Sequence, residues 1–203
     1  MSRIFVIAIK NGNKNDICTA LKLRDITSCR WGFSLEKVRD VNDFDENGHF
    51  ETIAVSATIS TWNYVVCDAF YDLKYVMNCC QDLNEKYNEM FSFSIDISLG
   101  TYRFLKIENK AITRFFDRNS NQEIGEFGVK LKEEDGLNGN DYYYVIDVVK
   151  KVLRLDTQVH FHKKLSVGKR YSHEVETYKE LYTPPEKNTE NQIINLQNDD
   201  LPF

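Results

Sequence analysis

The sequence is poor in proline, and the little it has stands near one end. The three prolines, Pro184, Pro185 and Pro202, all fall within the last 20 of 203 residues. Proline stops helices and inner strands, so the first 183 residues are free of its restrictions. The stretch that begins at Pro184 has too few apolar residues to offset the entropy lost on ordering it. We therefore expect a globular domain at 1–183 and a disordered linker and tip at 184–203.

Motifs that mark common enzymes are missing as well. The sequence contains no GxGxxG, GxxxxGK[ST], HExxH or GxSxG pattern. Its five cysteines are odd in number and lack the CxxC spacing of zinc sites and redox motifs. No apolar run approaches the roughly 18 residues that span a bilayer. We expect a cytoplasmic binding protein with reduced, mostly buried thiols, and without enzymatic activity, cofactor or membrane association.

Charge is present in quantity but is unevenly placed. The whole net charge of -5 lies in residues 171–203, where seven acids face two lysines. Residues 1–170 hold 24 charges of each sign. Binding to a phosphate backbone usually requires a broad electropositive surface. A neutral body with an acidic tail therefore argues against duplex DNA or RNA as a direct ligand.

Apolar periodicity predicts an α+β domain. Spacings of three and four predict a helix within 68–88, capped by Asp68, and a second helix within 141–155. Strand-like runs occur at 2–10, 49–59, 62–68, 90–98, 101–109, 111–119 and 158–167. Short turns between several of these runs favour antiparallel hairpins. We expect two layers, an antiparallel sheet and two main helices.

Two histidines form the only candidate for a metal site. His160 and His162 stand at alternate positions of an expected strand, so their side chains share one face. Together with His173 or a carboxylate they could hold a metal ion. An exposed strand face beside Lys163 and Lys164 explains the same pattern. We favour the exposed face, and keep the metal site as a weak candidate.

A group of aromatic and basic residues suggests contact with unpaired bases. Tyr102 and Phe104 share a strand face, and Arg103 and Arg114 are close in the sequence. Stacking of a base on an aromatic ring contributes roughly 1 to 3 kcal/mol. Aromatic residues at a spacing of two are, however, more often part of a core. Single-stranded DNA binding by the body is thus an alternative rather than the main prediction.

The body has a diffuse resemblance to known sequences. The stretches "NYVV", "DLKYVMNCCQDLNEKY", "ITRFFD", "GEFGVKLKEE" and "YVIDVVKKVLRLD" lie between about residues 60 and 157. This pattern resembles small uncharacterised bacterial proteins, some of them similar to immunity proteins that neutralise toxins by occlusion. The resemblance implies a compact α+β domain that works by binding. It implies no catalytic residue.

The tip has a more specific resemblance. Asp199, Asp200, Leu201, Pro202 and Phe203 are similar to the C-terminal peptide of bacterial single-stranded DNA-binding proteins. In that family an acidic stretch, an apolar residue, Pro and a last Phe follow a flexible linker. The resemblance implies that the tip recruits DNA-maintenance proteins with a pocket for the Phe, such as exonucleases and helicases. It does not extend to the body, whose expected helices differ from the oligonucleotide-binding barrel of that family.

The chemistry of this tip suits peptide docking. The ring of Phe203 can fill an apolar pocket while its α-carboxylate meets an arginine or backbone donors. Pro202 reduces the entropy lost on docking, and Asp199 and Asp200 steer the peptide to a basic rim. The leading hypothesis is a DNA replication or repair accessory factor, such as a phage encodes. Occlusion of a toxin and direct binding of single-stranded DNA remain the alternatives.

Overall fold

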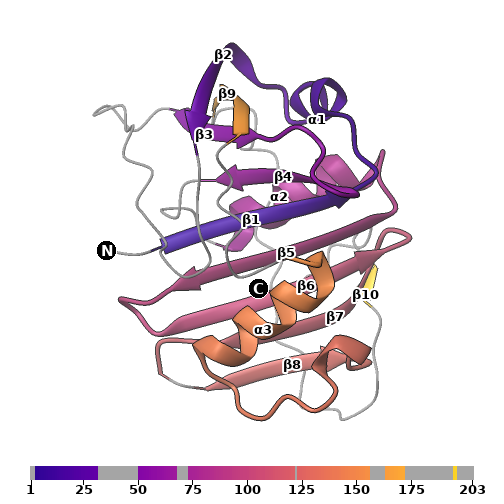
Figure 1. The fold of residues 1–203 in the computed structure, drawn as a ribbon, viewed down its shortest axis with the longest axis vertical. Helices are drawn as coiled ribbons and strands as arrows, with labels where there is room; N and C mark the ends of the chain where they lie inside the picture. The colour runs from indigo at the N-terminus through magenta and orange to yellow at the C-terminus, as the bar shows by residue number, and fades with distance from the viewer. Residues whose placement is uncertain are drawn as a thin grey trace.

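The fold is described for six segments of the chain. The computed structural model describes residues 3–31, 50–67, 73–121, 123–155, 163–171 and 194–195. Their elements are, in chain order, β1 (Arg3–Lys10), α1 (Lys14–Ala20), β2 (Arg24–Trp31), β3 (Phe50–Val55), β4 (Trp62–Cys67), α2 (Leu73–Asn84), β5 (Glu89–Asp96), β6 (Thr101–Glu108), β7 (Ala111–Arg118), β8 (Ile124–Gly128), the 3-10 helix η1 (Lys132–Glu134), α3 (Tyr142–Leu153), β9 (Lys163–Tyr171) and β10 (Ile194–Asn195). Figure 1 shows their arrangement.

One antiparallel sheet carries the fold. The described strands pair in the order β10-β7-β6-β5-β1-β4-β3-β9-β2, and β8 also pairs with β7. The strands β5, β6, β7 and β8 form a meander of consecutive hairpins. The first strand, β1, lies between β4 and β5 and so joins the meander to the other half of the sheet (Figure 1).

Both faces of the sheet are covered by helices. In β1, Phe5, Ile7 and Ile9 belong to one buried cluster, with α1 and α2, while Val6 and Ala8 belong to the other, with α3. A strand buried on both faces needs apolar residues at every position, which explains the unbroken apolar run of β1. The predicted α+β class and antiparallel sheet are confirmed. The helices lie on opposite faces, so there are three layers instead of the expected two.

Strong local patterns located most elements. The two predicted helices are present as α2 and α3, and the side chain of Asp141 caps α3 by accepting a hydrogen bond from the Tyr144 amide. Asp68, the expected cap of α2, lies outside the described residues. The sequence analysis missed β2, β8 and the seven-residue α1. These elements are short or polar, and β8 has two glycines in five residues, so tertiary pairing outweighs their local preference.

A β-bulge turns Arg114 toward α3. The pairing of β6 with β7 shifts between Lys106 and Ile107, which oppose Arg114 and Ile112, so that Thr113 is an extra residue. An extra residue reverses the alternation of the strand. Ile112 consequently belongs to the cluster on the α2 face, while Arg114 lies over the Phe104 ring on the α3 face.

Arg114 is buried in an ion pair that joins four elements. Its Nε and Nη2 atoms donate to the two carboxylate oxygens of Glu134 in η1, at 2.9 and 2.7 Å. Glu134 also accepts the hydroxyl of Tyr144 from α3, at 2.5 Å, and the amide of Leu131, at 2.8 Å. The guanidinium reaches Glu126 of β8 as well, at 2.7 Å. Arg114 is 1% and Glu134 5% exposed, so this cluster holds η1 and α3 against β7.

The cluster sets the charge state of its members. Burial tends to raise the pKa of Glu134, but the hydrogen bonds from Arg114 and Tyr144 outweigh burial, and the pKa lies below its ordinary value of 4.5. Burial and the neighbouring carboxylate raise the pKa of Tyr144. Burial opposes the charge of Arg114, yet its hydrogen bonds to Glu134 and Glu126 leave the pKa raised. Arg114 and Glu134 are therefore both charged at neutral pH.

Removal of the buried carboxylate should be far more damaging than removal of the exposed one. Glu134→Gln leaves a buried guanidinium without its bidentate partner, and we expect a loss of about 3 kcal/mol in the free energy of unfolding. Glu126→Gln removes the other partner of the same guanidinium, but its side chain is 43% exposed, so we expect less than about 1 kcal/mol. Urea unfolding at neutral pH measures both. Equal losses would contradict the assigned role of Glu134.

The contribution of Glu134 should disappear in acid. A carboxyl group whose pKa is lowered in the folded state stabilises fully above its unfolded pKa, and this stabilisation is lost as the pH falls through the folded pKa. We therefore expect the stability difference between the wild type and Glu134→Gln to be constant above about pH 5 and to shrink below 4.5. Urea unfolding across this range measures it. A difference that stays constant down to about pH 2 would contradict the lowered pKa.

Candidate functional site

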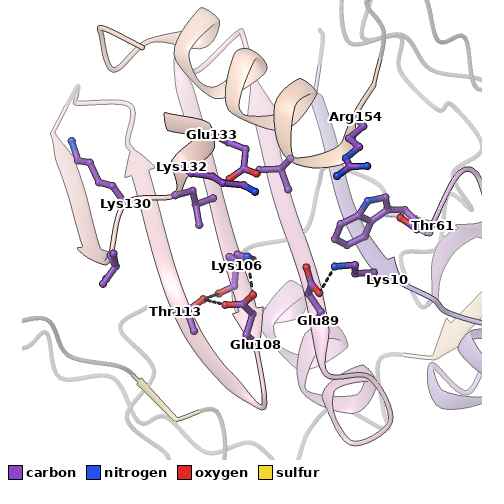
Figure 2. A pocket seen from close by; sticks show the side chains of 15 residues that line it. Lys10, Thr61, Glu89, Lys106, Glu108, Thr113, Lys130, Lys132, Glu133 and Arg154 are labelled. Carbon is purple, nitrogen blue, oxygen red and sulfur yellow. Dashed lines mark hydrogen bonds and ion pairs between the residues drawn. The ribbon is translucent and has the colours of Figure 1, made fainter. Parts of the chain in front are cut away.

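A pocket of about 830 Å³ lies on the α3 face at one end of the sheet (Figure 2). Its floor is formed where β1, β5 and β6 reach that end, and its walls are the segment that follows β8 and the last turn of α3. Pockets of this volume hold a drug-sized ligand or a short piece of peptide. The lining residues are Lys10, Thr61, Trp62, Glu89, Lys106, Glu108, Thr113, Gly128, Val129, Lys130, Leu131, Lys132, Glu133, Val152 and Arg154.

The floor of the pocket carries two ion pairs. Lys10 donates to Glu89 at 2.6 Å, and Lys106 lies 2.8 Å from Glu108 (Figure 2). Each pair joins charges at neighbouring positions of the sheet end, and each is partly open to solvent. Because their charges cancel, the pairs leave the floor polar but close to neutral.

The walls of the pocket carry an excess of positive charge. The lining has five cationic side chains against three carboxylates. Lys130, Lys132 and Arg154 are exposed, and no hydrogen bond or ion pair joins their side chains to another residue within the described segments. The half-buried Glu133 is the one carboxylate of the lining outside the floor pairs. The pocket is therefore electropositive on a body of balanced charge.

Arg154 is held at the pocket in an unusual backbone conformation. It follows α3 with φ 54° and ψ 42°, and its amide donates to the Lys150 carbonyl. Glycine is the usual residue in this left-handed cap, because a Cβ atom there costs roughly 1 to 2 kcal/mol. The conformation directs a long cationic side chain toward the pocket, as Figure 2 shows.

Gly128 allows the chain to turn from β8 into the pocket wall. Its φ is +82°, and a Cβ atom would lie 2.1 Å from the carbonyl oxygen of Thr113. Only glycine combines this conformation with such a close approach. The turn places Val129, Lys130 and Leu131 along the pocket, and Glu134 then enters its buried ion pair.

Apolar surface accompanies the charges. Leu131 and Val152 are half-buried, and Val129 is 71% exposed. Trp62 is largely buried, with the ammonium of Lys10 5.9 Å from its ring centroid. The lining contains no histidine, cysteine or serine. This combination suits the binding of an acidic group that is joined to an apolar one.

The predicted base-stacking group lies elsewhere, and most of it is covered. Phe104 and Arg114 are each 1% exposed, beneath α3. Arg103 is in an ion pair with Asp117 at 2.9 Å, and Tyr102 is half-buried. The prediction that Phe104 and Arg114 contact nucleic acid is wrong, because α3 packs over the face that the aromatic alternation offers.

The candidate metal ligands cannot be placed. His160, His162 and His173 lie outside the described residues. Within the described segments, no three His, Cys, Asp or Glu side chains are grouped as a metal site requires.

The described helices include none with the length and apolarity to cross a bilayer.

The side chains of three cysteines, Cys18, Cys79 and Cys80, are described, and all three are buried free thiols, as expected. Burial raises the pKa of Cys80, and the adjacent Cys79 raises it further. A thiol with a raised pKa is a poor nucleophile, since the thiolate is the reactive form. These three cysteines therefore belong to the core rather than to a reactive site.

The predicted tip, residues 199–203, lies outside the described residues. Within 184–203 the structure describes Ile194–Asn195, which form β10. Ile194 pairs with Ile112 and Asn195 with Ala111, at the start of β7. The predicted linker thus contains a short segment that meets the body beside the pocket.

We expect the left-handed backbone of Arg154 to lower the stability of the folded protein. Arg154→Gly relieves the left-handed strain, and we expect it to be about 1 kcal/mol more stable than Arg154→Ala, which removes the same guanidinium but keeps a Cβ atom. Urea unfolding of both variants measures the difference. Equal stability of the two would mean that the backbone at this position is not strained.

The pocket was not foreseen in the sequence, because its residues come from distant segments. The alternating Lys130 and Lys132 are the one local signal that could have indicated it. No protein-family model, curated protein or solved structure matches the chain. The roles of the pocket residues therefore follow from their own geometry and charge.

Proposed function

We propose that this chain is a non-catalytic, cytoplasmic binding protein of DNA replication or repair. Its tip, residues 199–203, docks on DNA-maintenance proteins, and its α+β body carries the tip and the electropositive pocket. The observation that carries the proposal is the acidic and apolar order of the tip, Asp-Asp-Leu-Pro-Phe, after the polar stretch that begins with Pro184 and Pro185.

The physical chemistry of the tip supports such docking. A Phe ring contributes much apolar area to a fitting pocket, and Pro202 lowers the entropy lost on binding. Asp199 and Asp200 add attraction to a basic rim, which salt weakens. A short peptide of this kind gains affinity from one aromatic anchor rather than from area.

The position of β10 also supports the proposal. β10 ends at Asn195, on the edge of β7, and residues 196–203 follow it in the sequence. A peptide carried this close to a folded body can be controlled by that body.

Loss of the Phe203 ring should abolish recruitment. We expect immobilised full-length protein to capture exonucleases or helicases from a bacterial lysate, and Phe203→Ala to reduce capture by at least about ten-fold. Leu196→Ala is the matched control, because it removes apolar area from the same tail outside the tip, and it should leave capture unchanged. Mass spectrometry identifies and counts the captured proteins.

Two other results would contradict the proposal. Equal capture by the wild type and Phe203→Ala would show that the tip does not recruit these proteins. Capture of a toxin by both variants would assign binding to the body and would favour the immunity-type alternative.

A further inference from the structure

We infer that the electropositive pocket is a docking site for the tip of this same chain, residues 199–203. The self-docking needs no other protein. Its regulatory consequence rests on the proposed function, because a tip held in the pocket cannot bind a partner at the same time.

β10 directs the chain toward the end of the sheet at which the pocket lies. β10 is antiparallel to β7, so the chain leaves Asn195 in the direction opposite to β7, past Ala111 and toward the end of the sheet where β6 ends. Glu108 and Thr113, which line the pocket, are at that end. Figure 1 shows β10 on the edge of β7 at this end of the meander.

The tip is also within reach. Thr113 follows Ile112, the partner of Ile194, so β10 lies next to a pocket residue. Asp199 and Asp200 stand four and five residues after Asn195. An extended chain covers up to about 3.5 Å per residue, so these carboxylates can travel roughly 14 to 17 Å from β10. Gly128 pairs with Arg114 on the same edge of β7 as β10, and Lys130 follows Gly128 by two residues, so this wall of the pocket lies within that reach.

The charges of the tip and the pocket are complementary. Asp199 and Asp200 carry two negative charges, and the pocket has a surplus of two positive ones. Lys130, Lys132 and Arg154 supply that surplus from the walls, where no described residue neutralises them through a hydrogen bond or ion pair. Glu133 opposes binding, but the three cations outnumber it.

The apolar part of the tip has a place as well. Leu201 and Phe203 follow the two acids directly, and Val129, Leu131 and Val152 lie beside the cations of the pocket. Val129 is 71% exposed, so apolar area is still available for burial. The pocket therefore offers cations for the two acids of the tip and, beside them, apolar side chains for Leu201 and Phe203.

Attachment to the body makes even weak docking effective. A short tether gives the tip an effective concentration in the millimolar range at the pocket. Docking that depends on exposed charges weakens at high salt. A partner with a tighter pocket for the tip will displace the body, so the self-docked state limits recruitment to partners of sufficient affinity.

Nuclear magnetic resonance of the full-length chain tests the self-docking without any partner. We expect Asp199→Asn with Asp200→Asn to shift the amide signals of Lys130, Lys132 and Arg154. Raising NaCl from about 50 to about 500 mM should shift the wild-type signals in the same direction. Glu186→Gln with Glu190→Gln is the matched control, because it removes two negative charges from the same tail, and it should leave these signals in place. Unchanged signals in the Asp variant, or equal shifts in both variants, would overturn the inference.

A charge exchange separates specific docking from general electrostatics. Lys130→Glu with Lys132→Glu should release the tip and raise partner capture by roughly two- to ten-fold. Adding Asp199→Lys and Asp200→Lys to that variant should restore docking, seen as recovery of the salt-sensitive Arg154 shift. No recovery would overturn the inference. Both lysines are exposed, so an unchanged thermal midpoint is expected for the lysine variant.

The two proposals can fail separately. Suppose that the amide signals of the pocket lysines and Arg154 do not shift when the tip is substituted, while Phe203→Ala still abolishes capture. Self-docking is then wrong and the proposed function stands. If the signals respond to the tip while capture is independent of Phe203, the tip binds the body but does not recruit these proteins.

Discussion

The buried ion pair between Arg114 and Glu134 joins the elements that border the pocket. It links β7 to η1, and the Tyr144 hydroxyl extends it to α3. A buried charge pair contributes little net stability compared with apolar packing, but either member alone is strongly destabilising. The pair therefore specifies one arrangement of these elements. The pocket walls, which precede η1 and follow α3, are placed by that arrangement.

The pocket and the tail have opposite charges, and β10, which belongs to the tail, lies close to the pocket. The body has balanced charge in the sequence, yet three cations without an ionic partner among the described residues line one pocket. The tail carries the excess of acids, and β10 brings it to the edge of β7. In the function and the self-docking that we propose, recruitment and self-recognition compete for the same five residues.

The sequence predicted those elements whose pattern is strong over a short stretch. Helices α2 and α3 and most strands of the sheet have clear apolar periodicity, which predicts them from the sequence alone. The sequence pattern does not predict β8, a five-residue strand with two glycines whose partner is β7. The sequence pattern did not predict the burial of Phe104 and Arg114 for a related reason. Phe104 and Arg114 carry suitable chemistry, but their accessibility depends on where α3 packs.

The sequence by itself determined the α+β class, the antiparallel hairpins, the acidic tail and the chemistry of its tip. These properties follow from local periodicity and from composition, which need no knowledge of distant contacts. Only the tertiary structure decided that the helices cover both faces, that a bulge turns Arg114 inward, and that Lys130, Lys132 and Arg154 share one pocket. Strand register and helix packing bring together residues that are far apart in the chain, and a short stretch of sequence does not predict such contacts.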